Sequence, residues 1–212
     1  MGTMIDDLQD PAALPDAARR VSLVQTHISL VFIGDDYVYK VKKPVDFGFL
    51  DFSTPEKRRH CCNQEVRLNQ RLSEGVYLEV LPVTREGGRH RLGGDEAEAV
   101  DWAVRMRRIP EEVLMRSLFD RDELGEGHLD SVAGLLARFH GRAERSERID
   151  AFGTLEGFKV NTDENFVQTE PYVGTTLSRE TFDRIRAWTD LFYREEGGLF
   201  ETRIREGRIR DC

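Results

Sequence analysis

Apolar residues alternate with polar ones, or occur in short β-branched runs, over much of the first hundred positions. The runs at 22–33, SLVQTHISLVFI, and 37–45, YVYKVKKPV, flank a Gly-Asp-Asp turn at 34–36, which predicts a hairpin. Two further strands are predicted at 77–84 and 98–106, separated by a Gly-rich hairpin loop. This part of the chain is therefore expected to be mostly β.

One long helix interrupts the strands. Residues 54–73 follow Ser53 or Thr54 as N-cap, carry Glu56 in position for a capping box with Ser53, and stop at Gly75. The pattern places Cys61, Leu68 and Leu72 on one apolar stripe with Glu65 in its middle.

Helical periodicity dominates after Pro110. It predicts helices around 111–121, 128–145 and 179–196, the last of them after an LSRE capping box. The tail, TRIREGRIRDC at 202–212, alternates like a hairpin. The chain is thus expected to be an α+β protein with an N-terminal extension (1–20), a β-rich lobe (21–108) and a mainly α lobe (109–212).

Charge and cysteine content narrow the function classes. A formal net charge of -8 opposes non-specific attraction to nucleic acid. Three cysteines without a disulfide or zinc spacing indicate a reducing, cytoplasmic compartment. No apolar run reaches the ~20 residues of a membrane span, and the N-terminus lacks a signal-peptide core. We expect neither nucleic acid nor membrane as a partner.

Glu65 needs a cation if it lies within the apolar stripe, because burial of an isolated carboxylate costs several kcal/mol. Lys40 is on the preceding strand, where Val38, Lys40 and Lys42 share one face. A helix packed on that face would bring Glu65 to Lys40, whose ammonium could then contact a phosphate. The alternative is that Glu65 and the lysines are solvated, as most helix charges are.

The order of these elements resembles the aminoglycoside phosphotransferase family of the protein-kinase-like fold. The resemblance covers residues 20–212 and rests on VYK at 38–40, NQEVRL at 63–68, WAVRMRRIP at 102–110 and LARFH at 136–140. The run VKKPVDFGFLDFS at 41–53 is similar to a bacterial subgroup of phosphotransferase-like proteins, in which a P-loop ATP-binding domain often follows.

The resemblance implies a two-lobed kinase-like fold and an Mg-ATP-dependent transfer of the γ-phosphoryl group to a hydroxyl acceptor. Lys40 matches the strand lysine that contacts the α- and β-phosphates, and Glu65 matches the helix glutamate that orients it. Residues 104–109 match the linker that binds adenine, with Met106 and Arg107 nearest the base.

Two positions depart from the family pattern. The loop between the first strands reads QTHIS, without the glycines that wrap phosphates, and leaves Ser29 as a single hydrogen-bond donor. The catalytic aspartate and the magnesium ligand are expected after Cys212, so we expect the chain to be a catalytically inactive fragment. The alternative function is a non-enzymatic nucleotide-binding or regulatory module.

Other reactive side chains are expected to be structural. His140 shares a helix face with apolar residues and is expected to pack there. Adjacent Cys61 and Cys62 point about 100° apart on a helix, which disfavours a shared metal ion. Cys212 has no base that the sequence identifies, and the aromatic run at 188–193 is expected to be packing.

Overall fold

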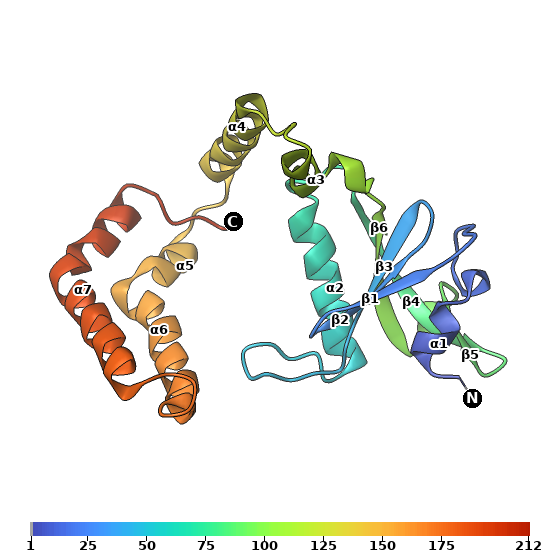
Figure 1. Cartoon of the computed structure of the whole chain (residues 1–212), viewed down its shortest axis with the longest axis horizontal. Coiled ribbons are helices and arrows are strands. Elements are labelled where there is room, and N and C mark those ends of the chain that lie inside the picture. Colours follow the sequence, from blue (N-terminus) through green and yellow to red (C-terminus); the bar gives the residue numbers. More distant parts are fainter. Residues whose placement is uncertain (1) are drawn as a thin grey trace. The chain divides into compact units, whose positions relative to one another are not determined.

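A computed structural model describes residues 2–212 and divides the chain into two compact units, 1–125 and 126–212. The first unit is α+β and the second is helical (Figure 1). The sequence placed the division after residue 108, whereas the structure groups 109–125 with the sheet. The two short helices of that segment are η3 (Glu111–Val113) and α3 (Met115–Asp120).

Six antiparallel strands form one sheet in the order β1-β2-β3-β6-β4-β5. The strands are β1 (Ser22–Gln25), β2 (Ser29–Ile33), β3 (Tyr37–Lys42), β4 (Tyr77–Glu86), β5 (Arg89–Leu92) and β6 (Asp101–Arg107). The hairpin predicted across 34–36 is confirmed by the pairing of β2 with β3.

The Gly-rich segment at 85–96 differs from its prediction as a loop. It contains β5, which pairs with the end of β4 through a tight turn at Gly87 and Gly88, both with positive φ. A short 3-10 helix, η2 (Glu96–Glu98), then leads to β6. The glycines therefore form the turns at both ends of β5. This strand was not predicted because its residues are mostly polar.

Helix α2 (Pro55–Asn69) covers one face of the sheet, where Cys62 packs with Trp102 and Val104. The N-terminal segment, with α1 (Met4–Leu8) and η1 (Pro11–Ala13), lies on the opposite side (Figure 1). Its residues Leu8 and Leu14 complete a core with apolar side chains of the strands. Both faces of the sheet are thus partly covered within this unit.

The N-cap of α2 is Thr54, whose hydroxyl accepts from the Lys57 amide. The predicted apolar stripe was wrong in its phase. The helix turns Arg58 and Cys62 inward, while Leu68 is exposed and Leu72 lies beyond the last helical residue. Glu65 nevertheless faces the sheet, because it is one turn from Cys62.

The second unit is built from helices. These are α4 (Glu126–Arg142), α5 (Glu147–Asp150), η4 (Ala151–Gly153), α6 (Leu155–Thr169), η5 (Glu170–Tyr172) and α7 (Arg179–Arg205). Phe182, Tyr193 and Phe200 of α7 are buried, and Phe166 and Phe158 of α6 contact the first and last of these rings. The periodic segment at 128–145 corresponds to α4, whereas α6 was not predicted.

The tail prediction was wrong. Helix α7 continues into the segment predicted as a hairpin and ends at Arg205, and Gly207 follows with φ +68°. The amide of Arg208 then donates to the Arg203 carbonyl, a hydrogen bond typical of a helix C-terminus. Residues 208–212 form no strand. Within residues 2–212, no helix has the length and apolar character of a membrane span.

Candidate functional site

Strand register places Lys40 in a row of side chains on the α2 face of the sheet. Val24 lies opposite Val31, Val31 opposite Lys40, and Lys40 opposite Val104. Directly opposed residues of antiparallel strands project to the same face. Since Val104 packs against α2, Lys40 projects to that face as well.

Glu65 of α2 receives two lysine ammonium groups from β3. Its Oε1 is 2.8 Å from Nζ of Lys40, and its Oε2 is 2.6 Å from Nζ of Lys42. The predicted pairing of Lys40 with Glu65 is therefore confirmed, and the solvated alternative is wrong. The pairing of Lys42 with the same carboxylate was not predicted, although its position two residues after Lys40 was the available signal.

The two lysines differ in their exposure. The Lys40 side chain retains 29% of its exposure, whereas Lys42 retains 6% and lies 4.8 Å from the centre of the Phe52 ring. Burial on its own would raise the pKa of Glu65, but the hydrogen bonds from Lys40 and Lys42 lower the pKa of this carboxyl below its ordinary value. Glu65 is therefore an anion at neutral pH.

Lys43, the residue after β3, stabilises the turn between β1 and β2. Lys43 Nζ donates to the Thr26 carbonyl at 2.7 Å, and its backbone amide donates to the Ile28 carbonyl. Both acceptors lie in the turn between β1 and β2. These contacts fix the turn between β1 and β2 beside Lys40 and Lys42. This turn is the QTHIS loop that the sequence predicted to lie near phosphates.

Ser29 begins β2 directly opposite Lys42 and is buried. Its amide donates to the Thr26 hydroxyl, and its own Oγ has no hydrogen-bond partner among the described residues. The predicted role of Ser29 as a donor to phosphate remains a prediction. Its hydroxyl lies on the α2 face, the same side of the sheet as the lysine pair.

An apolar patch adjoins Lys40 on the same face. It is formed by Val31, which lies opposite Lys40, by Val24, which lies opposite Val31, and by Val38, which lies two residues before Lys40 on the same strand. Helix α2 packs on β4 and β6, and Val24 retains 49% of its exposure. The patch therefore combines apolar surface with an adjacent cation.

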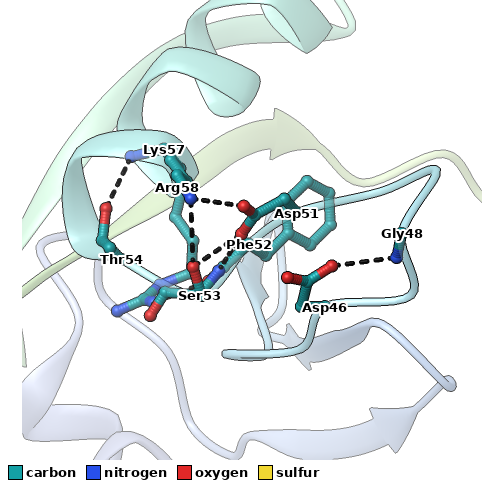
Figure 2. Close-up of polar contacts among 8 residues, drawn as sticks. All are labelled: Asp46, Gly48, Asp51, Phe52, Ser53, Thr54, Lys57 and Arg58. Atoms are coloured by element: carbon teal, nitrogen blue, oxygen red, sulfur yellow. Dashed lines mark hydrogen bonds and ion pairs between the residues drawn. The ribbon is translucent and has the colours of Figure 1, made fainter.

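The loop between β3 and α2 is fixed by polar contacts at its base (Figure 2). Asp46 accepts from the Gly48 amide, and Asp51 accepts from the amide and hydroxyl of Ser53 and from Lys57. The loop displays Phe47 and Phe49, stacked with ring centres 6.2 Å apart and both exposed.

Arg58 anchors that loop to the sheet. Its Nε and Nη2 bind the two carboxylate oxygens of Asp101 at 2.8 and 3.0 Å, and its Nη1 donates to the carbonyls of Phe52 and Ser53. Both charged side chains are buried. This pair holds the N-terminal end of α2, and hence the helix that carries Glu65, against β6.

Met106 and Arg107 lie in a strand, so the predicted linker at 104–109 is wrong for its first four positions. Met106 is opposite Val38 on one side and Tyr77 on the other. The Arg107 amide donates to the Val76 carbonyl, and the Arg108 amide to the Asp36 carbonyl. These two amides are therefore engaged within the protein, and the chain leaves the sheet only after Arg107.

A polar cavity of about 900 Å³ opens where β6 ends. Its lining combines arginines with acidic residues, and includes Arg20, Asp36, Tyr37, Arg108 and Glu111. Lys40 and Glu65 are not among the lining residues. Cavity and lysine pair are therefore separate features of the same unit.

Cys62 and Cys212 lie in different surroundings, one buried and one exposed beside His140. Cys62 is buried in the α2 interface, and this burial raises the pKa of its thiol to about 12. Cys212 lies in the second unit with Sγ 3.1 Å from Nδ1 of His140, and both side chains are exposed. His140 thus differs from its prediction as a packed core residue.

Comparison with known proteins finds relatives but no assigned activity. No family model matches the chain, and no solved structure matches it. Uncharacterized proteins of Mycobacterium bovis and of two Mycobacterium tuberculosis strains are each 34% identical to it over 191 residues. The match covers 90% of this chain and 36% of each relative. The chain therefore spans about a third of the length of these relatives.

Proposed function

We propose that residues 1–125 bind the phosphates of ATP through Lys40. The observation that carries this proposal is the 2.8 Å contact between Lys40 and Glu65. A lysine on the third strand, held by a glutamate from the adjacent helix, is the arrangement by which protein kinases place a cation on nucleotide phosphates. Lys40 is also the more exposed of the two lysines that contact Glu65.

The surroundings of Lys40 support a nucleotide rather than free phosphate. A purine base needs apolar surface for stacking and packing, and the patch of Val24, Val31 and Val38 lies beside the ammonium on the same face. The base would lie over the patch with its phosphates directed toward Lys40. Ser29 would offer its hydroxyl near these phosphates.

Magnesium would bind together with the nucleotide. Residues 2–212 contain no group of three or more His, Cys, Asp or Glu side chains arranged to hold a metal ion. Mg²⁺ commonly binds through substrate phosphates and only one or two carboxylates, so the phosphate oxygens would supply most of its ligands here. When bound, the ion would neutralise phosphate charge.

The whole protein would be a phosphotransferase that passes the γ-phosphoryl group to a hydroxyl acceptor. Lys40 would neutralise charge on the phosphates, and Glu65 would hold Lys40 beside their binding site before the nucleotide binds. Residues that orient or deprotonate an acceptor are not assigned among these 212 positions. In the alternative function, the protein is a module that also binds ATP through Lys40 but does not transfer its γ-phosphoryl group.

The direct test measures ATP binding by titration calorimetry with Mg²⁺ present. Lys40→Met is expected to weaken binding by at least tenfold, about 1.4 kcal/mol, because an ammonium is removed from the phosphates. Lys159→Met is the matched control, since Lys159 also forms an ion pair, with Asp163, but lies in the second unit.

Equal affinities of wild type and Lys40→Met would contradict the assignment of the lysine. Formation of ADP together with a phosphorylated form of an added hydroxyl acceptor by a full-length relative would favour the transferase over the non-enzymatic module. Binding by that relative without turnover for a range of hydroxyl acceptors would favour the module.

A further inference from the structure

Glu65 binds two cations at once, and this sharing distinguishes the site from a simple lysine–glutamate pair. Each carboxylate oxygen receives a different ammonium group, at 2.8 Å from Lys40 and 2.6 Å from Lys42. Two ammonium groups and one carboxylate carry a net charge of about +1 at neutral pH. A single pair would be neutral, and it would attract an anion less strongly.

Lys42 is held in place by its surroundings. Its side chain is nearly fully buried, faces the Phe52 ring, and lies opposite Ser29 in the adjacent strand. Lys40 is more exposed and is the lysine next to the apolar patch. Movement toward a bound anion is therefore open to Lys40 and costly for Lys42.

A carboxylate left without a cation in this position would carry a penalty. Glu65 is mostly buried, and an unpaired buried charge costs several kcal/mol or takes up a proton. In a simple pair, a lysine that turns toward phosphate would impose that penalty. With Lys42 in contact with the second oxygen, Glu65 stays paired when Lys40 moves.

We propose that Lys42 is the fixed counter-ion of Glu65, a positioning residue that leaves Lys40 free to bind a phosphate. The inference rests on the proposed nucleotide function and adds a second lysine to it. Lys42 acts through Glu65 and does not itself contact the ligand. The two lysines of the motif thus have different tasks, although both contact the same carboxylate.

The proposal predicts a pH dependence that a purely structural residue would not produce. Without Lys42, ATP would draw Lys40 away from Glu65 and the carboxylate would take up a proton. Binding to Lys42→Met would then improve relative to wild type as the pH falls from 8 to 6. Among the described residues, the other ionisable groups that interact with Glu65 are Cys62 of α2 and Tyr77 of β4, and Asp101 of β6 interacts in turn with Cys62.

The experiment compares ATP affinity of wild type, K40M, K42M, K42R and the double variant K42M/E65Q, each at pH 6 and pH 8. We expect K42M to bind ATP on the order of tenfold more weakly than wild type at pH 8, and K42R to retain affinity within about threefold. We expect K42M to have little effect in the E65Q background, because no carboxylate is left to be neutralised.

Each outcome separates the inference from the function on which it rests. If wild type binds ATP in a Lys40-dependent way and K42M binds equally well at both pH values, the inference is wrong and the proposed function stands. If wild type does not bind ATP, both are wrong. If K42M weakens binding as much in the E65Q background as alone, Lys42 contacts the ligand itself and the counter-ion role is overturned.

Folding is controlled in the same set of variants. Urea unfolding of each variant shows whether the buried methionine is tolerated. If K42M does not fold, the comparison of E65Q with K42M/E65Q still tests the proposal, since neither variant contains the carboxylate. Equal affinity of these two variants is the expected result and excludes a direct contact of Lys42 with the ligand, and a tenfold loss in the double variant contradicts the counter-ion role.

Discussion

At the scale of single residues, Arg58 and Asp101 form a buried ion pair in the first unit. Both side chains are buried, and two parallel N–H donors of the guanidinium meet the two carboxylate oxygens. Such a pair satisfies its own charges, but removal of one partner leaves the other buried and unpaired. The remaining Arg58 donor binds the carbonyls that precede α2.

Arg58→Ala is therefore expected to lower the free energy of unfolding of the first unit by about 3–5 kcal/mol. The measurement is urea denaturation followed by the fluorescence of Trp102, which packs beside the pair. Arg116→Ala is the control, because Arg116 and Asp120 form an exposed pair worth less than about 1 kcal/mol. A loss for Arg58→Ala no larger than the control would contradict the role assigned to the pair.

From the apolar stripe alone, the pairing of Lys40 with Glu65 stayed open against a solvated alternative, and the family resemblance decided for the pairing. Sequence reasoning did not reach Lys42, since one cation already satisfied the carboxylate. It also did not pair Arg58 with Asp101, which are 43 residues apart in the chain. The contact follows from the packing of α2 on β6, which local patterns do not specify.

At the scale of elements, two glycines, one within helix α7 and one just after its end, have opposite structural demands. Gly207 ends the helix with φ +68°, a conformation that costs an L-residue about 1–2 kcal/mol. Gly198 lies within the helix, is exposed, and has open space where a Cβ would be placed. An interior helical glycine costs about 0.5–1 kcal/mol relative to alanine.

Substitution by alanine should therefore change stability in opposite directions at these two positions. Gly207→Ala is expected to lower the midpoint of thermal unfolding of the second unit, and Gly198→Ala to raise it, each by an amount equivalent to about 1 kcal/mol. Circular dichroism at 222 nm follows both. A stabilising Gly207→Ala would show that the helix does not end as described.

Element predictions succeeded where composition and capping agreed, as for β3 and the start of α2. They failed for β5, whose four residues are mostly polar, and for α6, whose sequence LEGFKVNTDENFVQT lacks a distinct apolar stripe. The aromatic packing predicted for 188–193 is correct for Tyr193, which is buried, and wrong for Trp188, which is exposed. Tertiary contacts decide these cases.

At the scale of the whole molecule, the second unit exposes much apolar surface. Phe152, Val160, Val167 and Trp188 each retain more than 60% of their exposure. Exposed apolar side chains favour association or mark a binding surface where they gather into a patch. The first unit encloses its apolar side chains more completely, in one core on each face of its sheet.

We therefore expect the 212-residue chain to self-associate as its concentration rises. Light scattering across a concentration series should show an increasing mean mass, and Trp188→Glu should reduce the increase. Glu111→Gln, a change on the first unit, serves as the control. A single monomeric mass for the wild-type chain throughout the series would contradict the expectation.

The lysine pair, its glutamate and the buried arginine pair all lie within residues 1–125. No residue of the second unit is needed to form these contacts. Gene rearrangement could therefore join this unit to a different neighbouring unit without disturbing its ion pairs. Under the proposed function, modular inheritance of this kind would allow one way of holding phosphate to serve enzymes that modify unrelated molecules.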